Sequence, residues 1–263
     1  MVVLALVLGA TLGARQAVRA GVDWTIALDI ITWGGIAGVL GSKAYSIVLH
    51  PGMLDQFTFA RFRSTGLVWY GGAAAGVAAA AWRFRRTRLP MVALFDQGAP
   101  ALAAGHALGR IGCLLAGDDY GFSTQLPWGI ALPLGAPPST AGYLRAHGDA
   151  IAAAIPDWQI MTVHPVMIYE AMGNALIAAF LWRRSHGAYR PWSNVALYCV
   201  LYGALRFALE FLRPKDDRLA SGLTVAQLVS TALVLIGVAL LAWKRRAAPE
   251  FIRGQIAPRD RTT

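Results

Sequence analysis

Long apolar stretches, interrupted by short polar segments, recur along most of the 263-residue chain. Most of them approach the roughly 20 residues that an α-helix needs to cross a bilayer. The stretches are continuous, whereas the strands of a membrane barrel alternate apolar and polar positions, so the pattern predicts transmembrane helices. The predicted spans are Val2–Ala14, Trp24–Val48, Gly66–Trp82, Leu89–Leu115, Met161–Leu181, Trp192–Leu212 and Leu223–Trp243.

The pattern as a whole predicts an all-α, polytopic membrane protein of about seven transmembrane helices. Residues 1–245 are expected to form one transmembrane domain, because no hydrophilic block within them is long enough to fold alone. This domain includes the longest loop, 116–160, as a cap on one side of the membrane. Residues 246–263 form a polar tail. The first apolar stretch is shorter than a span, which is compatible with a first helix that starts further upstream.

Charge sets the orientation of this domain. Charged residues make up only 14% of the chain, against about 25% in soluble domains, and the formal net charge is +10. Nucleic acid is not expected as a partner, because the basic residues form short clusters at helix ends. One side carries Arg15, Arg19, Arg83, Arg85, Arg86, Arg88, Arg183, Arg184, Arg190, Lys244, Arg245, Arg246 and the tail residues Arg253, Arg259 and Arg261. The other carries Arg61, Arg63, Arg145, Arg213, Lys215 and Arg218. Positive loops face the cytoplasm, so we expect a cytoplasmic tail, an outer N-terminus and an outer cap.

The remaining basic residues, Lys43, Arg110 and Arg206, fall inside the predicted spans. A cation at membrane depth is costly and indicates function. Arg110 lies roughly 10 Å from the outer helix end at a rise of 1.5 Å per residue, and Arg206 lies at a similar depth. Guanidinium groups match phosphate oxygens, so the pair predicts a site for a phospholipid phosphate. Snorkelling of Arg110 or Lys43, and a simple helix-internal pair of Arg206 with Glu210, remain open alternatives.

Other polar side chains occupy the same predicted level. His106 lies one turn before Arg110 on the same helix face, although a packed core histidine is the alternative. Further polar residues at this level are Tyr202 and Glu210, His164, Tyr169 and Glu170, Trp69 and Tyr70, and Gln227. Cys113 and Cys199 lack the spacing of a metal site or a disulfide, so they are expected to be packing residues.

Several phrases of the sequence follow one another in a specific order and spacing. They are Leu94–Pro100, Gly109–Gly121, Leu126–Ile130, His164–Glu170, Tyr202–Arg213 and Thr224–Ser230. Together they resemble the prolipoprotein diacylglyceryl transferase family over most of the chain. The resemblance implies a seven-helix bundle in the bacterial inner membrane with its N-terminus outside, in agreement with the charge pattern. We expect a monomer surrounded by membrane lipid.

The resemblance also implies a reaction. A diacylglyceryl group moves from phosphatidylglycerol to the lipobox cysteine of an exported prolipoprotein, and glycerol phosphate leaves. The nucleophile belongs to the substrate, so the enzyme needs no cysteine, metal or nucleotide. Arg110 and Arg206 match arginines of the family and would stabilise charge on the leaving phosphate. The expected substrate-binding residues are Arg110, Arg206, Tyr202, Glu210, His106, Asp118, Tyr169 and Glu170, and the catalytic candidates are Arg110, Arg206, His164 and Tyr70.

The chain departs from the family pattern where the acceptor thiol would be deprotonated. Tyr70 stands in place of the histidine often proposed as the base, and a tyrosine with a reference pKa of about 10 is a poorer base near neutrality. Cys113 and Ala116 replace asparagines, and Asp118 replaces a glutamate. Met167 stands where a glutamine is common.

These departures leave several hypotheses open. Either His106 or His164 deprotonates the thiol, or the thiol ionises without a strong base, or the chemistry has changed. One alternative function is therefore a divergent member that binds phospholipid but uses another acceptor or is inactive. A small transporter is a further alternative, which the lack of evident inverted repeats disfavours.

Overall fold

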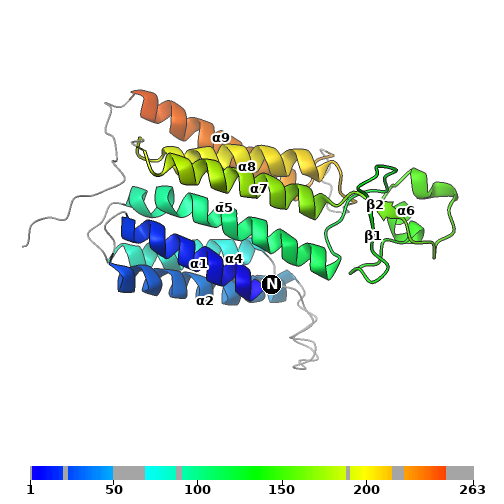
Figure 1. The fold of residues 1–263 in the computed structure, drawn as a ribbon, viewed down its shortest axis with the longest axis horizontal. Coiled ribbons are helices and arrows are strands. Elements are labelled where there is room, and N and C mark those ends of the chain that lie inside the picture. Colours follow the sequence, from blue (N-terminus) through cyan, green and yellow to red (C-terminus); the bar gives the residue numbers. More distant parts are fainter. Residues whose placement is uncertain are drawn as a thin grey trace, which may run out of the picture. The chain divides into compact units, whose positions relative to one another are not determined.

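The computed structural model describes residues 2–19, 23–49, 69–86, 91–187, 190–214 and 222–246, and these ranges are mostly helical (Figure 1). The helices are α1 (Val2–Arg19), α2 (Trp24–Leu49), α4 (Trp69–Phe84), α5 (Met91–Ala116), α6 (Ala141–Ala146), α7 (Val166–Arg184), α8 (Ser193–Glu210) and α9 (Val225–Arg246). Within the described ranges, three helical segments are long and apolar enough to cross a membrane: Trp24–Leu49, Phe95–Ala116 and Val225–Trp243. The chain is thus a helical membrane protein. The predicted tail lies almost entirely outside the described residues.

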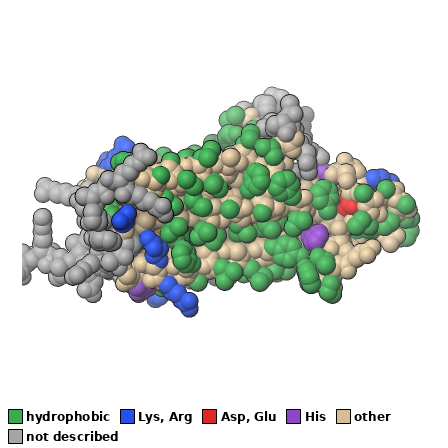
Figure 2. Space-filling view, turned by 90° about the horizontal axis from the view of Figure 1, so that it is seen from above, with side chains coloured by type: hydrophobic (Ala, Val, Ile, Leu, Met, Phe, Trp, Pro, Cys, Tyr) green, Lys and Arg blue, Asp and Glu red, His purple; other side chains and the backbone are tan. Residues whose placement is uncertain are grey.

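The helices match the predicted spans with shifts at their ends. Helix α1 continues to Arg19, beyond the predicted end at Ala14. The added residues are partly polar, so a prediction based on apolar residues alone leaves them out. Helix α7 begins at Val166, five residues after the predicted start at Met161. Large apolar side chains are exposed along the helices, for example Leu176 at 71% and Leu235 at 64%. Figure 2 shows such side chains spread over the helical surface, as expected for side chains that face lipid.

The described residues divide into two compact units. In unit 2, residues 10–98, helices α2 and α4 pack closely through small residues. A Cβ atom added to Gly41 would lie 2.6 Å from the carbonyl oxygen of Gly71, and one added to Gly72 would lie 2.9 Å from that of Gly38. Small residues permit this backbone approach, which drives helix association where lipid surrounds both helices.

Unit 1, residues 2–9 and 99–246, contains the second part of α5 and helices α7, α8 and α9. Helices α8 and α9 are in close contact, since a Cβ atom on Gly237 would lie 2.6 Å from the carbonyl oxygen of Ala196. Helix α7 packs against α8 on the other side (Figure 1). The apolar core of these helices consists of Ala99, Ala103, Ile177, Leu181, Tyr198 and Tyr202.

The cap, residues 117–165, connects α5 to α7. Strand β1 (Ile130–Ala131) pairs antiparallel with β2 (Thr162–Val163), and α6 and a short 3₁₀ helix (Ile151–Ala154) complete the cap. The prediction of an all-α chain therefore needs one amendment. Two-residue strands are too short to show the alternation of apolar and polar residues that predicts a strand. Strand β2 also lies within the apolar stretch Met161–Leu181, for which the sequence predicts a membrane span. The cap core consists of Tyr120, Ala141, Leu144, Ala152, Met161, Val163 and Met167.

Candidate functional site

A cluster of charged side chains lies in unit 1 next to the cap, where α5 and α8 end and α7 begins. We call it the arginine–carboxylate cluster; its members are Arg110, Arg206, Arg213, Asp119, Glu170 and Glu210. Three guanidinium groups thus face three carboxylates among the described residues. A buried cluster of this kind needs matched charges, because an unpaired ion in a low-dielectric site is strongly destabilising.

Arg110 joins α5 to the cap and to α7. Its Nη1 donates to Asp119 Oδ2 at 2.6 Å, and its Nε lies 3.1 Å from Glu170 Oε2. The Arg110 side chain is 14% exposed and that of Glu170 is fully buried. Asp119 has a positive φ of 59°, a conformation that aspartate tolerates better than most residues, and this turn directs its carboxylate to Arg110.

Arg206 pairs with Glu210 one turn later on α8, with 2.6 Å between Nη1 and Oε2. The other carboxylate oxygen of Glu210 accepts a hydrogen bond from the Thr224 hydroxyl at 3.1 Å, just before α9 begins. The Thr224 backbone N–H donates to the side-chain oxygen of Gln227 at 3.0 Å. The helix-internal pair considered for Arg206 is therefore present, and it is fixed from the start of α9.

Arg213 connects the two halves of the cluster, although sequence analysis grouped it with the basic residues of an outer loop. Its side chain is 1% exposed and lies 3.4 Å from Asp119, 3.5 Å from Glu170 and 3.9 Å from Glu210. Arg213 does follow α8, which ends at Glu210, but its side chain is buried against Asp119 and Glu170 instead of being exposed like a loop charge. Its spacing of three residues from Glu210 and seven from Arg206, one face of a helix, was the signal that could have found it.

His106 and Tyr202 lie beside the same cluster. His106 Nε2 lies 3.7 Å from Glu170 Oε1, and the rings of His106 and Tyr202 have centroids 4.8 Å apart. Tyr202 is nearly buried and also stacks on Tyr198, with centroids 5.5 Å apart. These aromatic contacts hold the imidazole beside the carboxylate.

His164 and Tyr169 form a separate contact with the cap. The Tyr169 hydroxyl accepts a hydrogen bond from the indole N–H of Trp128 at 2.7 Å and lies 3.4 Å from His164 Nδ1. Among the described residues, neither side chain touches an arginine of the cluster. Burial lowers the pKa of His164 below its ordinary value, so the ring is neutral near neutrality.

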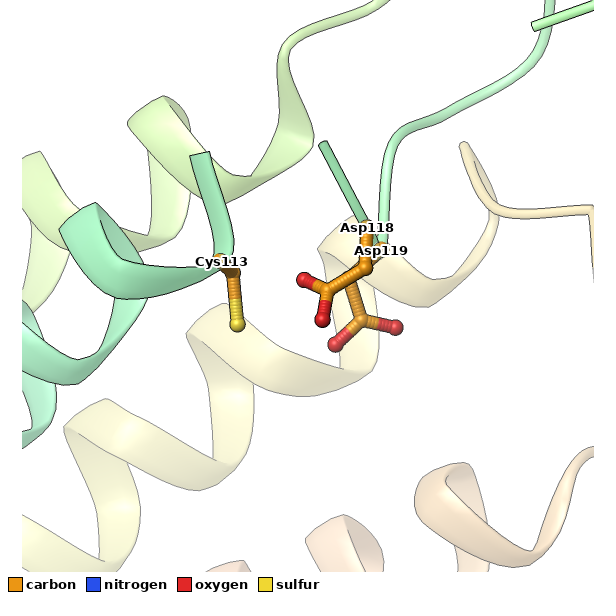
Figure 3. Close-up of side chains that lie close together, drawn as sticks. All are labelled: Cys113, Asp118 and Asp119. Carbon is orange, nitrogen blue, oxygen red and sulfur yellow. The ribbon is translucent and has the colours of Figure 1, made fainter. Parts of the chain in front are cut away.

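Asp118 lies beside Cys113 and not within the ion pairs, which use its neighbour Asp119 instead. Figure 3 shows these three side chains close together, and their possible ligand atoms lie within 4.8 Å of one another. Such a set could in principle hold a cation. However, Arg110 occupies Asp119 and lies 3.7 Å from the Cys113 sulfur, so a guanidinium charge already stands where a metal would sit. Burial raises the pKa of the Asp118 carboxyl, which further weakens it as a metal ligand.

Comparison with known proteins identifies the family. The model of the family described as prolipoprotein diacylglyceryl transferase matches residues 1–243. The chain belongs to the prolipoprotein diacylglyceryl transferase family. The resemblance seen in the sequence phrases is thus confirmed, and the chain is a membrane-bound transferase of lipoprotein biosynthesis.

Named members of the prolipoprotein diacylglyceryl transferase family cover most of the chain. A phosphatidylglycerol–prolipoprotein diacylglyceryl transferase of Finegoldia magna is 28% identical over 91% of this chain and 87% of its own length. One from Xanthomonas oryzae is 31% identical over 86% of this chain and 78% of its own length. One from Synechococcus elongatus is 26% identical over the whole chain and 89% of its own length.

Tyr70, the departure from the prolipoprotein diacylglyceryl transferase pattern, belongs to unit 2. Its backbone is in the first turn of α4, but its side chain lies outside the described part of the structure. Its catalytic role stays a prediction.

Proposed function

We propose that the arginine–carboxylate cluster binds the phosphate of phosphatidylglycerol, and that the diacylglyceryl group passes from there to the lipobox cysteine of a prolipoprotein. The observation that carries the proposal is the linkage of Arg110 and Arg206, from two helices, through carboxylates that both contact Arg213. Two guanidinium groups held in one network present a preorganised site for a phosphate.

The exposures within the cluster suggest a role for each arginine. Arg110 and Arg206 are 14% and 13% exposed, so both remain accessible to a lipid headgroup. Arg213 is 1% exposed and holds the carboxylates in position from the buried side of the cluster. Asp119, at 27%, is the most exposed carboxylate of the cluster, and it is the anion that a phosphate would displace from Arg110. The arriving phosphate thereby keeps the charges of the cluster paired.

The arginines act on the charge that develops during transfer. When the bond between the glyceryl carbon and the phosphate oxygen breaks, the phosphodiester monoanion becomes a monoester with a second negative charge. Preorganised donors in a site shielded from water stabilise such a charge far more than they would in water. The reaction therefore gains from guanidinium groups that bind the product phosphate more strongly than the substrate phosphate.

We place the cap on the outer face of the bacterial inner membrane, with seven spans, an outer N-terminus and a cytoplasmic tail. The cap precedes α7, while Arg183 and Arg184 end that helix on the opposite side. The positive-inside rule assigns the arginine side to the cytoplasm, so the cap faces exported prolipoproteins. The chain acts as a monomer in this proposal.

A complementation assay in a bacterium depleted of its own transferase tests the proposal. The wild-type chain should restore growth, and Arg110→Ala and Arg206→Ala should each abolish this rescue. Arg86→Ala, which removes an exposed arginine after α4, is the matched control and should rescue. Rescue by either cluster variant would remove that arginine from the mechanism.

A second candidate function rests on Tyr70, Cys113 and Ala116, which replace residues of the family pattern. A divergent member would bind phosphatidylglycerol but leave the prolipoprotein thiol unmodified. Purified protein with vesicles and a lipobox peptide separates the two, because only an active transferase adds the diacylglyceryl mass to the peptide. Transport would instead give solute flux in proteoliposomes, and we expect none.

A further inference from the structure

We infer that His106, paired with Glu170, removes the proton from the acceptor thiol. This inference rests on the function proposed above and concerns its other half, the activation of the nucleophile. The neutral imidazole is the usual side chain for proton transfer near pH 7.

The structure singles out His106 among the histidines that it describes. His147 Nδ1 bonds to the carbonyl oxygen of Tyr143, and His186 Nδ1 bonds to that of Trp182 at the far end of α7. His164 contacts Tyr169 and the cap. Within the described residues, only His106 lies next to a carboxylate of the arginine–carboxylate cluster. A base for the thiol must reach the sulfur as it approaches the glyceryl carbon next to the phosphate, and His106 lies beside the cluster proposed to bind that phosphate.

Glu170 has one carboxylate oxygen for the arginines and one for the imidazole. Its Oε2 lies 3.1 Å from Arg110 and 3.5 Å from Arg213, whereas its Oε1 faces His106 at 3.7 Å. Oε1 is fully buried and has no hydrogen-bond partner among the described residues. A buried acceptor without a partner gains a strong, charge-assisted hydrogen bond once the imidazole ring becomes protonated. Catalytic hydrogen bonds are often long before substrate binds and shorten in its complex.

The charges around the ring suit a base that must be neutral before the reaction. Arg110 lies four residues later on the same helix, Arg206 and Arg213 belong to the same cluster at the end of α8, and Glu170 faces the ring from α7. Glu170 stabilises the imidazolium after transfer, when the departing phosphate also neutralises part of the positive field. Tyr202 packs against the ring and restrains it in this orientation.

Proton transfer to His106 precedes the formation of the carbon–sulfur bond. The thiol proton moves to a ring nitrogen of His106, and the thiolate sulfur attacks the glyceryl carbon next to the phosphate. A carbon–sulfur bond forms while the carbon–oxygen bond to the phosphate breaks, and glycerol phosphate leaves with the electron pair. The imidazolium then releases its proton to the leaving phosphate or to water.

The test compares a lipobox peptide that contains cysteine with the same peptide that contains selenocysteine. A selenol ionises without help near neutral pH, so it does not need a base. The His106→Gln variant of the full chain is placed in phosphatidylglycerol vesicles. Transfer to each peptide is then followed by mass spectrometry. We expect the rate with the cysteine peptide to fall about a hundredfold or more, the usual contribution of a general base, while the selenocysteine peptide is modified at nearly the wild-type rate.

The ratio of the two rates is taken on one protein preparation, so it does not depend on how much of the variant folds. His186→Gln, at the exposed end of α7, is the control and should leave the ratio unchanged. An equal loss with both peptides would overturn the inference, because it would show that His106 only supports the site. If the wild-type chain modifies neither peptide, the proposed function itself is wrong and the inference falls with it.

Discussion

Arg213 and Glu170 form a buried ion pair although 43 residues separate them in the chain. Arg213 Nη2 lies 3.5 Å from Glu170 Oε2, and the two side chains are 1% and 0% exposed. Through Arg213, the end of α8 is attached to the start of α7 and to the cap. The pair therefore decides whether the two accessible arginines, Arg110 and Arg206, remain in one site.

Arg213→Ala should destabilise the protein and abolish transfer. It leaves Arg110 as the one guanidinium partner of Glu170 and Asp119 among the described residues, and removal of one partner from a buried pair typically costs about 3–5 kcal/mol. Arg213→Lys keeps the charge but loses the planar fork, so an intermediate loss is expected. Thermal unfolding in detergent measures the effect, with the exposed Arg85→Ala as the control. An unfolding temperature for Arg213→Ala equal to that of the wild type would contradict the structural role.

Asp119→Asn should strengthen binding of phosphatidylglycerol. The Asp119 carboxylate competes with the lipid phosphate for Arg110, and its removal should lower the dissociation constant by about tenfold, or about 1.4 kcal/mol. Binding to vesicles with and without phosphatidylglycerol measures this. Asp118→Asn removes the same charge one residue earlier, outside the ion pairs of the cluster, and should have a smaller effect. Weaker binding by Asp119→Asn would show that this carboxylate supports Arg110 instead of competing with the lipid.

Gly237→Ala should weaken the contact between α8 and α9. The new methyl group would lie 2.6 Å from the carbonyl oxygen of Ala196, and backbone cannot move aside cheaply. We expect a loss of about 1–3 kcal/mol in the free energy of unfolding. Gly35→Ala is the control, because nothing lies within 4 Å of its added Cβ and a helical alanine should stabilise by up to about 1 kcal/mol. Equal behaviour of the two variants would mean that α8 and α9 are not in close contact.

His164 should make the protein less stable in acid. Burial lowers the pKa of its imidazole below the ordinary 6.5, so the unfolded chain binds the proton more tightly than the native state does. The stabilisation from the neutral ring is complete above the unfolded pKa and is lost as the pH falls toward the folded pKa. His164→Asn should therefore reduce the fall in unfolding temperature between about pH 7.5 and about pH 5. The exposed His186→Asn should leave this fall unchanged. A fall of equal size in His164→Asn and the wild type would show that the ring does not contribute.

Much of the site could be predicted from sequence because helical spacing places residues on one face. The turn between His106 and Arg110, and the stripe of Tyr202, Arg206 and Glu210, follow from a period of about 3.6 residues. Glu170 was already among the polar residues predicted at the same level, and the family resemblance, whose phrases include it, was confirmed. Helical spacing did not show that Asp119, and not Asp118, pairs with Arg110. This pairing depends on the positive φ of Asp119 just after the end of α5.

Arg213 and the cap show what the sequence alone did not predict. Basic residues next to a span read as loop charges, and the burial of Arg213 becomes visible only when α7 and the cap pack over it. The same holds for His164, whose motif suggested the arginine site but whose ring contacts Tyr169.

The amino-acid sequence by itself determined that this chain is a helical membrane protein, because a preference for lipid is a sum over local composition and needs no knowledge of neighbours. It also identified Arg110, Arg206, Glu170 and Glu210 as candidates for one site, and the family to which the chain belongs. Only the tertiary structure decided which of these residues share charges, since an ion pair such as Arg213 with Glu170 depends on distances of a few ångströms between helices far apart in the chain. Such distances follow from packing, which no local pattern encodes.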